Sequence, residues 1–183
     1  MPDARTWVTD TSVYTHLCRA GHVEILERLA PGGVVLVPDD VRVEIENGRD
    51  RHPNIPDPSS TAWAQVTVLT EDEVWTQLAV KAALAGGPEQ HLGECAVIAC
   101  AKHRGYTALM DDREAITQAE VHKVQWHDTL WLVIEAHLTL PGYNRDHTIR
   151  VVDDLLDTGM YLPFDSGESV FTWAYQEGLL PRE

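Results

Sequence analysis

The chain alternates between short apolar runs, which are typical of buried strands, and longer segments in which apolar residues recur with helical spacing. The clearest strand is the continuous run Val34–Val37, and the clearest helix is Leu92–Lys102, which is rich in small and apolar residues. Parallel strands need a crossover connection, which a helix provides, so this alternation favours a mostly parallel sheet. We therefore predict an α/β fold, a three-layer α/β/α sandwich with a mostly parallel central sheet.

The other elements follow from the same two patterns and from the Gly and Pro residues that separate them. Further strands are predicted at residues 5–9, 66–69, 106–110 and 121–126. Further helices are predicted at residues 13–18, 23–29, 39–46, 71–85, 129–137, 144–157 and 165–179. Residues 49–60 contain three prolines and almost no apolar side chain, so we expect an exposed loop over the site.

The length of 183 residues is usual for one domain. We expect residues 1–183 to form a single domain, with residues 141–183 as a C-terminal helical extension packed on it. No apolar stretch approaches the roughly 20 residues needed to cross a bilayer, and Met1–Asp10 lacks the basic start and apolar run of a signal peptide. We therefore expect a cytoplasmic protein without a membrane partner.

Cysteines and tryptophans are predicted to fill the core rather than a site. The three cysteines are an odd number without CxxC spacing, and a reduced thiol packs well in an apolar helix. Tryptophans in amphipathic segments are expected to be buried. These core predictions concern Cys18, Cys95, Cys100, Trp63, Trp75 and Trp173.

Acidic residues stand at the ends of the predicted strands and at the starts of helices. Asp10 directly follows the first strand, and Asp111 and Asp112 follow the strand at residues 106–110. Glu44 lies on the helix after the second strand, and Glu94 begins its helix. Ligands of parallel sheets bind beyond the carboxyl ends of the strands, so we expect these acids to share one edge.

Clustered carboxylates repel one another, and a divalent cation resolves the repulsion. The clustered acids offer only oxygen ligands, and no His/Cys grouping has zinc spacing, so the cation is expected to be Mg²⁺ or Mn²⁺. Two such ions can activate water and neutralise the leaving oxygen of a phosphodiester. We predict catalytic roles for Asp10, Glu44, Glu94 and Asp112, and metal-ligand roles for these four and for Asp111.

The net charge argues against a generic nucleic-acid-binding surface. The chain has 29 acidic and 14 basic side chains and a formal net charge of -15, whereas proteins that bind nucleic acids are normally basic. A bound cation reverses the local field, so an acidic protein can still accept a phosphate at its metal site. Binding away from that site should be weak.

Four motifs carry a resemblance to a known family: Val8-Thr-Asp10-Thr-Ser12, Val37-Pro-Asp-Asp-Val-Arg-Val-Glu44-Ile45, Gly93-Glu94-Cys-Ala-Val-Ile-Ala99 and Leu109-Met-Asp-Asp112-Arg113. In this order, and over roughly the first 140 residues, the chain resembles a PIN domain. The resemblance implies a metal-dependent ribonuclease, often the toxin of a type II toxin–antitoxin pair, with RNA as substrate, a small antitoxin as partner and frequent homodimers.

Carried over from the family, the acidic positions match Asp10, Glu44, Glu94 and Asp112. Asp111 is an adjacent candidate, and the hydroxyl of Thr11 or Ser12 is a candidate to support the ligands. Two of these assignments have a neighbouring competitor. Periodicity does not separate Asp111 from Asp112, and Glu46 competes with Glu44.

Several of the acids also have an ordinary structural explanation. Asp10 could cap the first helix, and Glu94 could simply complement the positive end of its own helix. Asp128 is interpreted as a helix cap in preference to an extra site acid. Arg113 could contact a phosphate, although an ion pair with the neighbouring acids is favoured.

Two other functions remain to be weighed against a ribonuclease. The strongly acidic surface and Asp128 also permit a PIN-like protein that no longer cleaves and serves as an interaction module. A phosphatase-like hydrolase is disfavoured, because the sequence has no obvious nucleophile motif.

Overall fold

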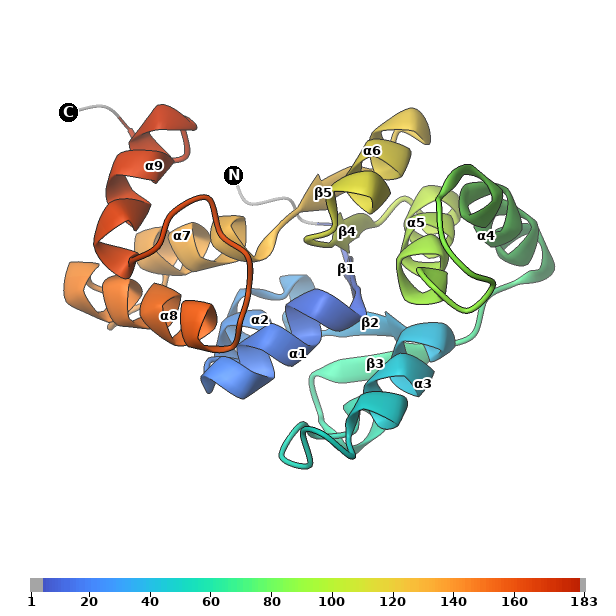
Figure 1. Ribbon diagram of the computed structural model, residues 1–183, viewed down its shortest axis with the longest axis horizontal. Helices are drawn as coiled ribbons and strands as arrows, with labels where there is room; N and C mark the ends of the chain where they lie inside the picture. The colour runs from blue at the N-terminus through green and yellow to red at the C-terminus, as the bar shows by residue number, and fades with distance from the viewer. Residues whose placement is uncertain (1–4, 182–183) are drawn as a thin grey trace.

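The computed structural model describes residues 5–181 and contains a five-stranded parallel sheet in the order β3-β2-β1-β4-β5 (Figure 1). The register aligns Trp7 of β1 with Val35 of β2 and Thr107 of β4, so the strands end at a common edge. The prediction of a parallel α/β/α sandwich is therefore confirmed. The strands are β1 (Trp7–Thr9), β2 (Val35–Pro38), β3 (Ala64–Thr67), β4 (Thr107–Leu109) and β5 (Gln125–His127).

Helices cover both faces of this sheet. On one side α5 packs against β1, β2 and β4, and α4 lies on α5; on the other side α1, α2, α7 and α8 pack on one another (Figure 1). The helices are α1 (Thr11–Ala20), α2 (Glu24–Leu29), α3 (Asp39–Gly48), α4 (Glu71–Ala83), α5 (Leu92–Arg104), α6 (Arg113–Val121), α7 (Thr129–Thr139), α8 (Arg145–Asp157) and α9 (Val170–Gln176). Short 3₁₀ turns lie at Pro31–Gly33, Pro58–Ser60 and Gly167–Ser169.

The small residues of α5 allow this helix to lie against the sheet. Every residue from Cys95 to Ala101 is buried, and the thiols of Cys95 and Cys100 are free, as predicted for core cysteines. Cys18 is half-buried and packs against the core. In residues 5–181, no helix is long and apolar enough to cross a membrane.

The chain between β4 and β5 differs from the prediction. A helix, α6, occupies residues up to Val121, and the chain turns at Lys123, whose φ is +59°, before β5 begins. The predicted strand at residues 121–126 was therefore wrong for its first half. Helix α6 escapes detection because its buried residues are only Ala115 and Ala119, which give a weak apolar signal.

Other boundaries and exposures also needed correction. Strand β3 lies two residues earlier than predicted, and α9 begins at Val170 after a 3₁₀ turn instead of at residue 165. Trp63 is buried and Trp173 half-buried, but Trp75 is 65% exposed, so its predicted burial was wrong.

The predicted loop at residues 49–60 is not simply exposed. Ile55 is buried in the core, and the hydroxyl of Tyr14 in α1 donates a hydrogen bond of 3.0 Å to the carbonyl of Pro56. These two contacts hold the loop against α1. None of its residues lines the cavity described below.

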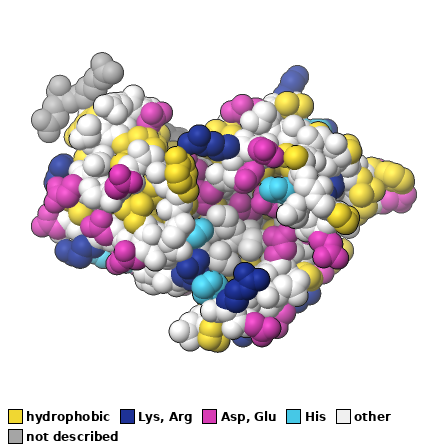
Figure 2. Space-filling view, in the orientation of Figure 1, with side chains coloured by type: hydrophobic (Ala, Val, Ile, Leu, Met, Phe, Trp, Pro, Cys, Tyr) yellow, Lys and Arg dark blue, Asp and Glu magenta, His cyan; other side chains and the backbone are white. Residues whose placement is uncertain are grey.

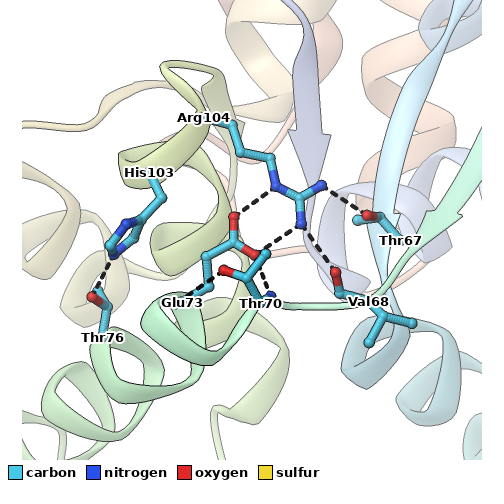
Figure 3. Close-up of polar contacts among 7 residues, drawn as sticks. All are labelled: Thr67, Val68, Thr70, Glu73, Thr76, His103 and Arg104. Carbon is cyan, nitrogen blue, oxygen red and sulfur yellow. Dashed lines mark hydrogen bonds and ion pairs between the residues drawn. The ribbon is translucent and has the colours of Figure 1, made fainter.

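A buried ion pair joins α4, α5 and the end of β3 (Figure 3). Arg104 donates to both carboxylate oxygens of Glu73, at 2.6 and 2.8 Å, and also to the hydroxyl of Thr67 and the carbonyl of Val68. The side chain of Glu73 is 1% exposed, and Arg104 holds the pKa of this carboxyl below its ordinary value. The chain that links β3 to α4 is thereby fixed to α5.

Replacing Glu73 should destabilise the protein strongly. In Glu73→Gln the guanidinium of Arg104 loses its charged partner, so we expect the free energy of unfolding to fall by about 3 kcal/mol near neutral pH. Urea unfolding measures the change. Glu71→Gln is the matched control, because Glu71 lies exposed in the same helical turn. Equal stability of the two variants would contradict a stabilising role for the ion pair.

Candidate active site

Asp10 lies at the carboxyl end of β1 and is completely buried. Its Oδ1 atom accepts a hydrogen bond of 2.8 Å from the backbone N–H of Val13 and so caps α1. Its Oδ2 atom is buried and has no partner with hydrogen-bond geometry in the described structure, although the backbone N–H of Asp111 lies near enough to lower the pKa of the carboxyl. Only one oxygen of this carboxylate is therefore used by the helix, and the cap does not exclude a further role.

Two other acids act on Asp10. Burial raises the pKa of Asp10 well above its ordinary value, and the negative charges of Asp111 and Glu94 raise it further. These three side chains come from the ends of β1 and β4 and from the first turn of α5. The common edge of the sheet thus brings them together, as expected for parallel strands.

Asp111 is held in place by the helix that follows β5. Its Oδ1 accepts from the backbone N–H of Thr129 at 2.9 Å, and its Oδ2 accepts from the hydroxyls of Thr129 at 2.8 Å and Ser12 at 3.4 Å. Burial raises the pKa of Asp111 to about 6. Asp112 instead caps α6, where its Oδ1 accepts from the N–H of Ala115 at 2.8 Å.

Glu44 reaches the same edge from α3. Its carboxylate accepts hydrogen bonds from the hydroxyl of Thr11 and, at 2.8 Å, from the backbone N–H of Gly93. Burial raises its pKa. Glu46 is exposed and forms an ion pair of 2.9 Å with Arg49, so it lies on the outer side of the helix.

The close approach of Glu44 depends on the glycine at position 93. A Cβ added to Gly93 would lie 2.6 Å from Oε2 of Glu44 and 3.0 Å from its carboxyl carbon. Such distances require the carboxylate to move. The absence of a side chain at Gly93 therefore leaves the space that the carboxylate of Glu44 occupies at the start of α5.

The variant Gly93→Ala tests this packing. Alanine normally stabilises a helix relative to glycine, but the clash with Glu44 should outweigh that gain and lower the free energy of unfolding by about 1–3 kcal/mol. Gly48→Ala serves as the control, because nothing lies within 4 Å of a Cβ at that helical position. It should leave stability unchanged or raise it. Urea unfolding of both variants separates a local clash from helix propensity.

Glu94 and Asp128 complete the acidic surface around Asp10. The side chain of Glu94 is 19% exposed, and its Oε1 lies 3.5 Å from Nδ1 of His91. Asp128 caps α7 by accepting from the N–H of Trp131 at 2.7 Å, so the prediction of a cap is confirmed. Burial raises the pKa of Asp128, whose charge in turn acts on Asp111.

Two charged residues near the site were missed in the sequence. The charge of Asp40, in the first turn of α3, raises the pKa of Glu44. The ammonium of Lys81 on α4 is buried without a hydrogen-bond partner in the described chain, and its charge acts on the Cys95 thiol, as do those of Glu44 and Glu94. The position of Asp40 beside Glu44 could have been inferred from helical spacing. Nothing in the sequence indicates Lys81, because its placement depends on how α4 packs on α5.

A cavity of about 990 Å³ opens at this acidic edge. In the space-filling view a hollow separates the C-terminal helices from the α5–α6 side, and acidic side chains gather in it (Figure 2). The lining combines acids at the sheet edge with apolar and aromatic residues, several of which come from the segment between α8 and α9 and from α9 itself. The residues that line it include Ser12, His16, His91, Glu94, Asp111, Asp112, Arg113, Trp126, Asp128, Met160, Tyr161, Leu162, Trp173 and Glu177.

The donor set fits a hard divalent cation, although its carboxylates are not assembled as a ligand group. Across residues 5–181, no three His, Cys, Asp or Glu side chains are arranged to hold one metal ion. Hydrogen bonds to Val13, Thr129 and Gly93 hold Asp10, Asp111 and Glu44 at their separate positions. The Oδ2 atom of Asp10 is nevertheless buried without a hydrogen-bond partner, and the negative charges of Asp111 and Glu94 repel the carboxylate. A bound cation would relieve this repulsion.

The stability of the metal-free protein should depend on pH. Asp10, Glu44 and Asp111 bind a proton more tightly in the folded than in the unfolded chain, because their folded pKa values are raised. Their contribution favours folding below about pH 4, the ordinary range of carboxyl groups, and is lost as the pH rises through the folded values, about 6 for Asp111.

We expect Mn²⁺ to raise the free energy of unfolding much more at pH 7.5 than at pH 5, because the carboxylates must be ionised to bind it. Urea unfolding in EDTA and in Mn²⁺ at the two pH values measures this difference. Asp111→Asn should reduce both the pH dependence and the effect of Mn²⁺. An undiminished response in that variant would exclude Asp111 from the titrating group.

Comparison with known proteins gives one match. A family model described as a PIN domain matches residues 6–172. The match extends beyond the first 140 residues, where the sequence motifs lie, through α8 and into α9. No curated protein and no solved structure was found to match the chain.

Proposed function

The chain belongs to the PIN-domain family, a family with a nuclease fold, and from this we propose that it is a metal-dependent endoribonuclease that hydrolyses RNA phosphodiester bonds. The observation that carries the proposal is the buried carboxylate of Asp10, one oxygen of which has no partner while Asp111 and Glu94 act on it. A buried, repelled carboxylate without a counter-charge is costly, and a divalent cation supplies that charge.

The residues proposed to hold Mg²⁺ or Mn²⁺ are Asp10, Glu44, Glu94 and Asp111. Glu94 and Asp111 line the cavity, as do Asp112 and Asp128, whereas Asp10 and Glu44 lie behind its lining residues. When bound, the cation supplies a Lewis acid for the phosphodiester and lowers the pKa of water. Asp111 is preferred over Asp112 because its negative charge acts on the buried carboxyl of Asp10.

The chain's own hydrogen bonds position these carboxylates. The hydroxyls of Ser12 and Thr129 orient Asp111, and the hydroxyl of Thr11 together with the N–H of Gly93 orients Glu44. Each carboxylate keeps its geometry because its partner belongs to a helix start packed on the sheet. Removing such a supporting contact typically lowers metal affinity or activity by about 10- to 100-fold.

A direct test is cleavage of a panel of single-stranded and structured RNAs by the full chain with Mg²⁺, with Mn²⁺ and with EDTA. DNA strands of the same sequences form the substrate control. We expect cleavage of RNA that requires a divalent cation and stops in EDTA. Cleavage of DNA but not of RNA, or cleavage of neither, would reject the ribonuclease assignment.

We propose further that the protein is the toxin of a type II toxin–antitoxin pair, with a small antitoxin as inhibitor and a homodimer as its working form. The support is the resemblance of the sequence motifs, among them those around Glu94 and Asp112, to PIN domains, which are often such toxins. Growth arrest on expression, relieved by the product of a short neighbouring reading frame, is the expected result. If the protein cleaves RNA but its expression leaves growth unchanged, the toxin role is rejected and the ribonuclease function is not. A cytoplasmic location remains a prediction from the sequence.

The alternative function is a PIN-like interaction module that no longer cleaves. It is favoured by the lack of three carboxylates arranged as a metal-ion group within the described part of the chain. Binding of Mn²⁺ discriminates the two functions, because only the ribonuclease needs the cation.

A further inference from the structure

The segment between α8 and α9 presents one aromatic side chain to the cavity. Met160 and Leu162 are buried, at 8% and 7% exposure, whereas Tyr161 between them is 84% exposed. Neighbouring residues of an extended chain point to opposite sides, so anchoring Met160 and Leu162 in the core turns Tyr161 outward. Tyr161 lines the same cavity as Asp111 and Glu94. The backbone of Tyr161 is thus anchored beside the acidic edge, with its ring exposed.

A cation lies over this ring. The guanidinium carbon of Arg113, at the start of α6, is 5.9 Å from the centroid of the Tyr161 ring. Arg113 is exposed and forms no ion pair with the acids of residues 5–181, so the favoured sequence interpretation of an ion pair was wrong. Its charge remains available to an anion that enters the cavity, one residue from Asp112.

Two further aromatic residues line the cavity. Trp126 belongs to β5 and Trp173 to α9, and both are half-buried. Aromatic faces and an arginine beside a phosphodiester site are the chemistry that binds unpaired nucleotides, since bases stack on aromatic rings and arginine contacts phosphate. In a duplex the bases are already stacked on one another and do not reach such a ring.

A peptide is the competing occupant of this cavity. A basic peptide would be attracted by the six acids that line the cavity, among them Glu114 and Glu177. At the exposed aromatic ring, however, its charges would be repelled by Arg113, and a cation bound by the acids would offset the charge that attracts the peptide elsewhere in the cavity. The pairing of Arg113 with Tyr161 therefore favours a ligand with an aromatic face and a negative charge, which describes a nucleotide.

We propose that Tyr161 and Arg113 form a nucleotide subsite, in which an unpaired base of the RNA strand stacks on Tyr161 and its phosphate contacts Arg113. The subsite rests on the proposed ribonuclease function, because Tyr161 and Arg113 line the same cavity as Glu94 and Asp111. It makes the C-terminal segment a determinant of substrate choice, because stacking on Tyr161 favours RNA with an unpaired base at this position.

The test compares binding of fluorescently labelled single-stranded RNA by wild type, Tyr161→Ala and Tyr161→Phe, using anisotropy at low salt in Ca²⁺, a hard cation that oxygen ligands bind and that offsets the charge of the cavity's acids. Tyr175→Ala is the matched control, because Tyr175 is exposed on α9 but does not line the cavity. We expect Tyr161→Ala to weaken binding about tenfold, the usual range for loss of one stacked base, with Tyr161→Phe and Tyr175→Ala close to wild type. In a series of RNAs that each lack one base, wild type and Tyr161→Ala should bind with equal affinity only to the RNA that lacks the base stacked on Tyr161.

Equal affinity of Tyr161→Ala and wild type would overturn the subsite, and so would a loss that is the same for every abasic strand. Binding of a lysine-rich peptide but of no RNA would replace the nucleotide by a peptide. The failure of the proposed function has a separate signature. RNA binding that depends on Tyr161, without cleavage by wild type in Mg²⁺ or Mn²⁺, would reject the ribonuclease and retain the subsite.

Discussion

Asp10→Asn is expected to lower the rate of RNA cleavage by about 1000-fold or more in saturating Mn²⁺. Removing a residue that only supports a ligand typically costs 10- to 100-fold, and Asp10 is proposed as a ligand itself. The side-chain oxygen of Asn can still accept from the N–H of Val13, so the cap of α1 is retained. Single-turnover cleavage of one RNA by the two proteins measures the effect.

The stability of this variant provides the control for misfolding. The buried carboxylate of Asp10 is repelled by Asp111 and Glu94, and the neutral amide removes that repulsion. We therefore expect metal-free Asp10→Asn to unfold at the same or a higher urea concentration than wild type at pH 7.5. If the variant is inactive and also less stable, unfolding explains its loss of activity. If the variant cleaves RNA as fast as wild type, Asp10 is not a metal ligand of the active site.

Asp111→Asn and Asp112→Asn should differ sharply, although the residues are neighbours. The charge of Asp111 acts on Asp10, and two hydroxyls orient its carboxylate, so we expect Asp111→Asn to lose about 100-fold or more in cleavage. Asp112 caps α6, and asparagine is an equally good cap, so Asp112→Asn should keep stability within about 0.5 kcal/mol and activity within a few-fold.

Cleavage rates and urea unfolding of the two variants decide between the adjacent acids. Asp112→Ala adds a control for the cap itself, since it should lose about 1 kcal/mol of stability. The reverse order of activities, with Asp112→Asn the inactive variant, would make Asp112 the ligand in place of Asp111.

The strand ends could be predicted because the information is local. An apolar run followed by an acid gives Asp10 and the Asp111-Asp112 pair directly, and parallel pairing then brings β1 and β4 side by side. Helical spacing likewise favours Glu44 over Glu46, because Glu44 shares the inner side of α3 with Val41 and Ile45, and the contacts of the two side chains then separate them.

Other features depend on contacts between distant segments. The choice between Asp111 and Asp112 depends on where β4 ends and α6 begins, which periodicity leaves uncertain by a residue. Lys81 reaches its buried position through the packing of α4 on α5, and Tyr161 reaches the cavity through the anchoring of its neighbours. Neither position carries a local pattern that distinguishes it from an ordinary surface residue.

The central claim is that the acids at the carboxyl edge of the sheet bind a divalent cation. Calorimetric titration of the metal-free full chain with Mn²⁺ at pH 7.5 tests it most directly, with Asp10→Asn titrated in parallel. We expect saturable binding by wild type below millimolar Mn²⁺ and its loss in Asp10→Asn. Absence of binding by wild type at millimolar Mn²⁺, or equal binding by the two proteins, would contradict the claim.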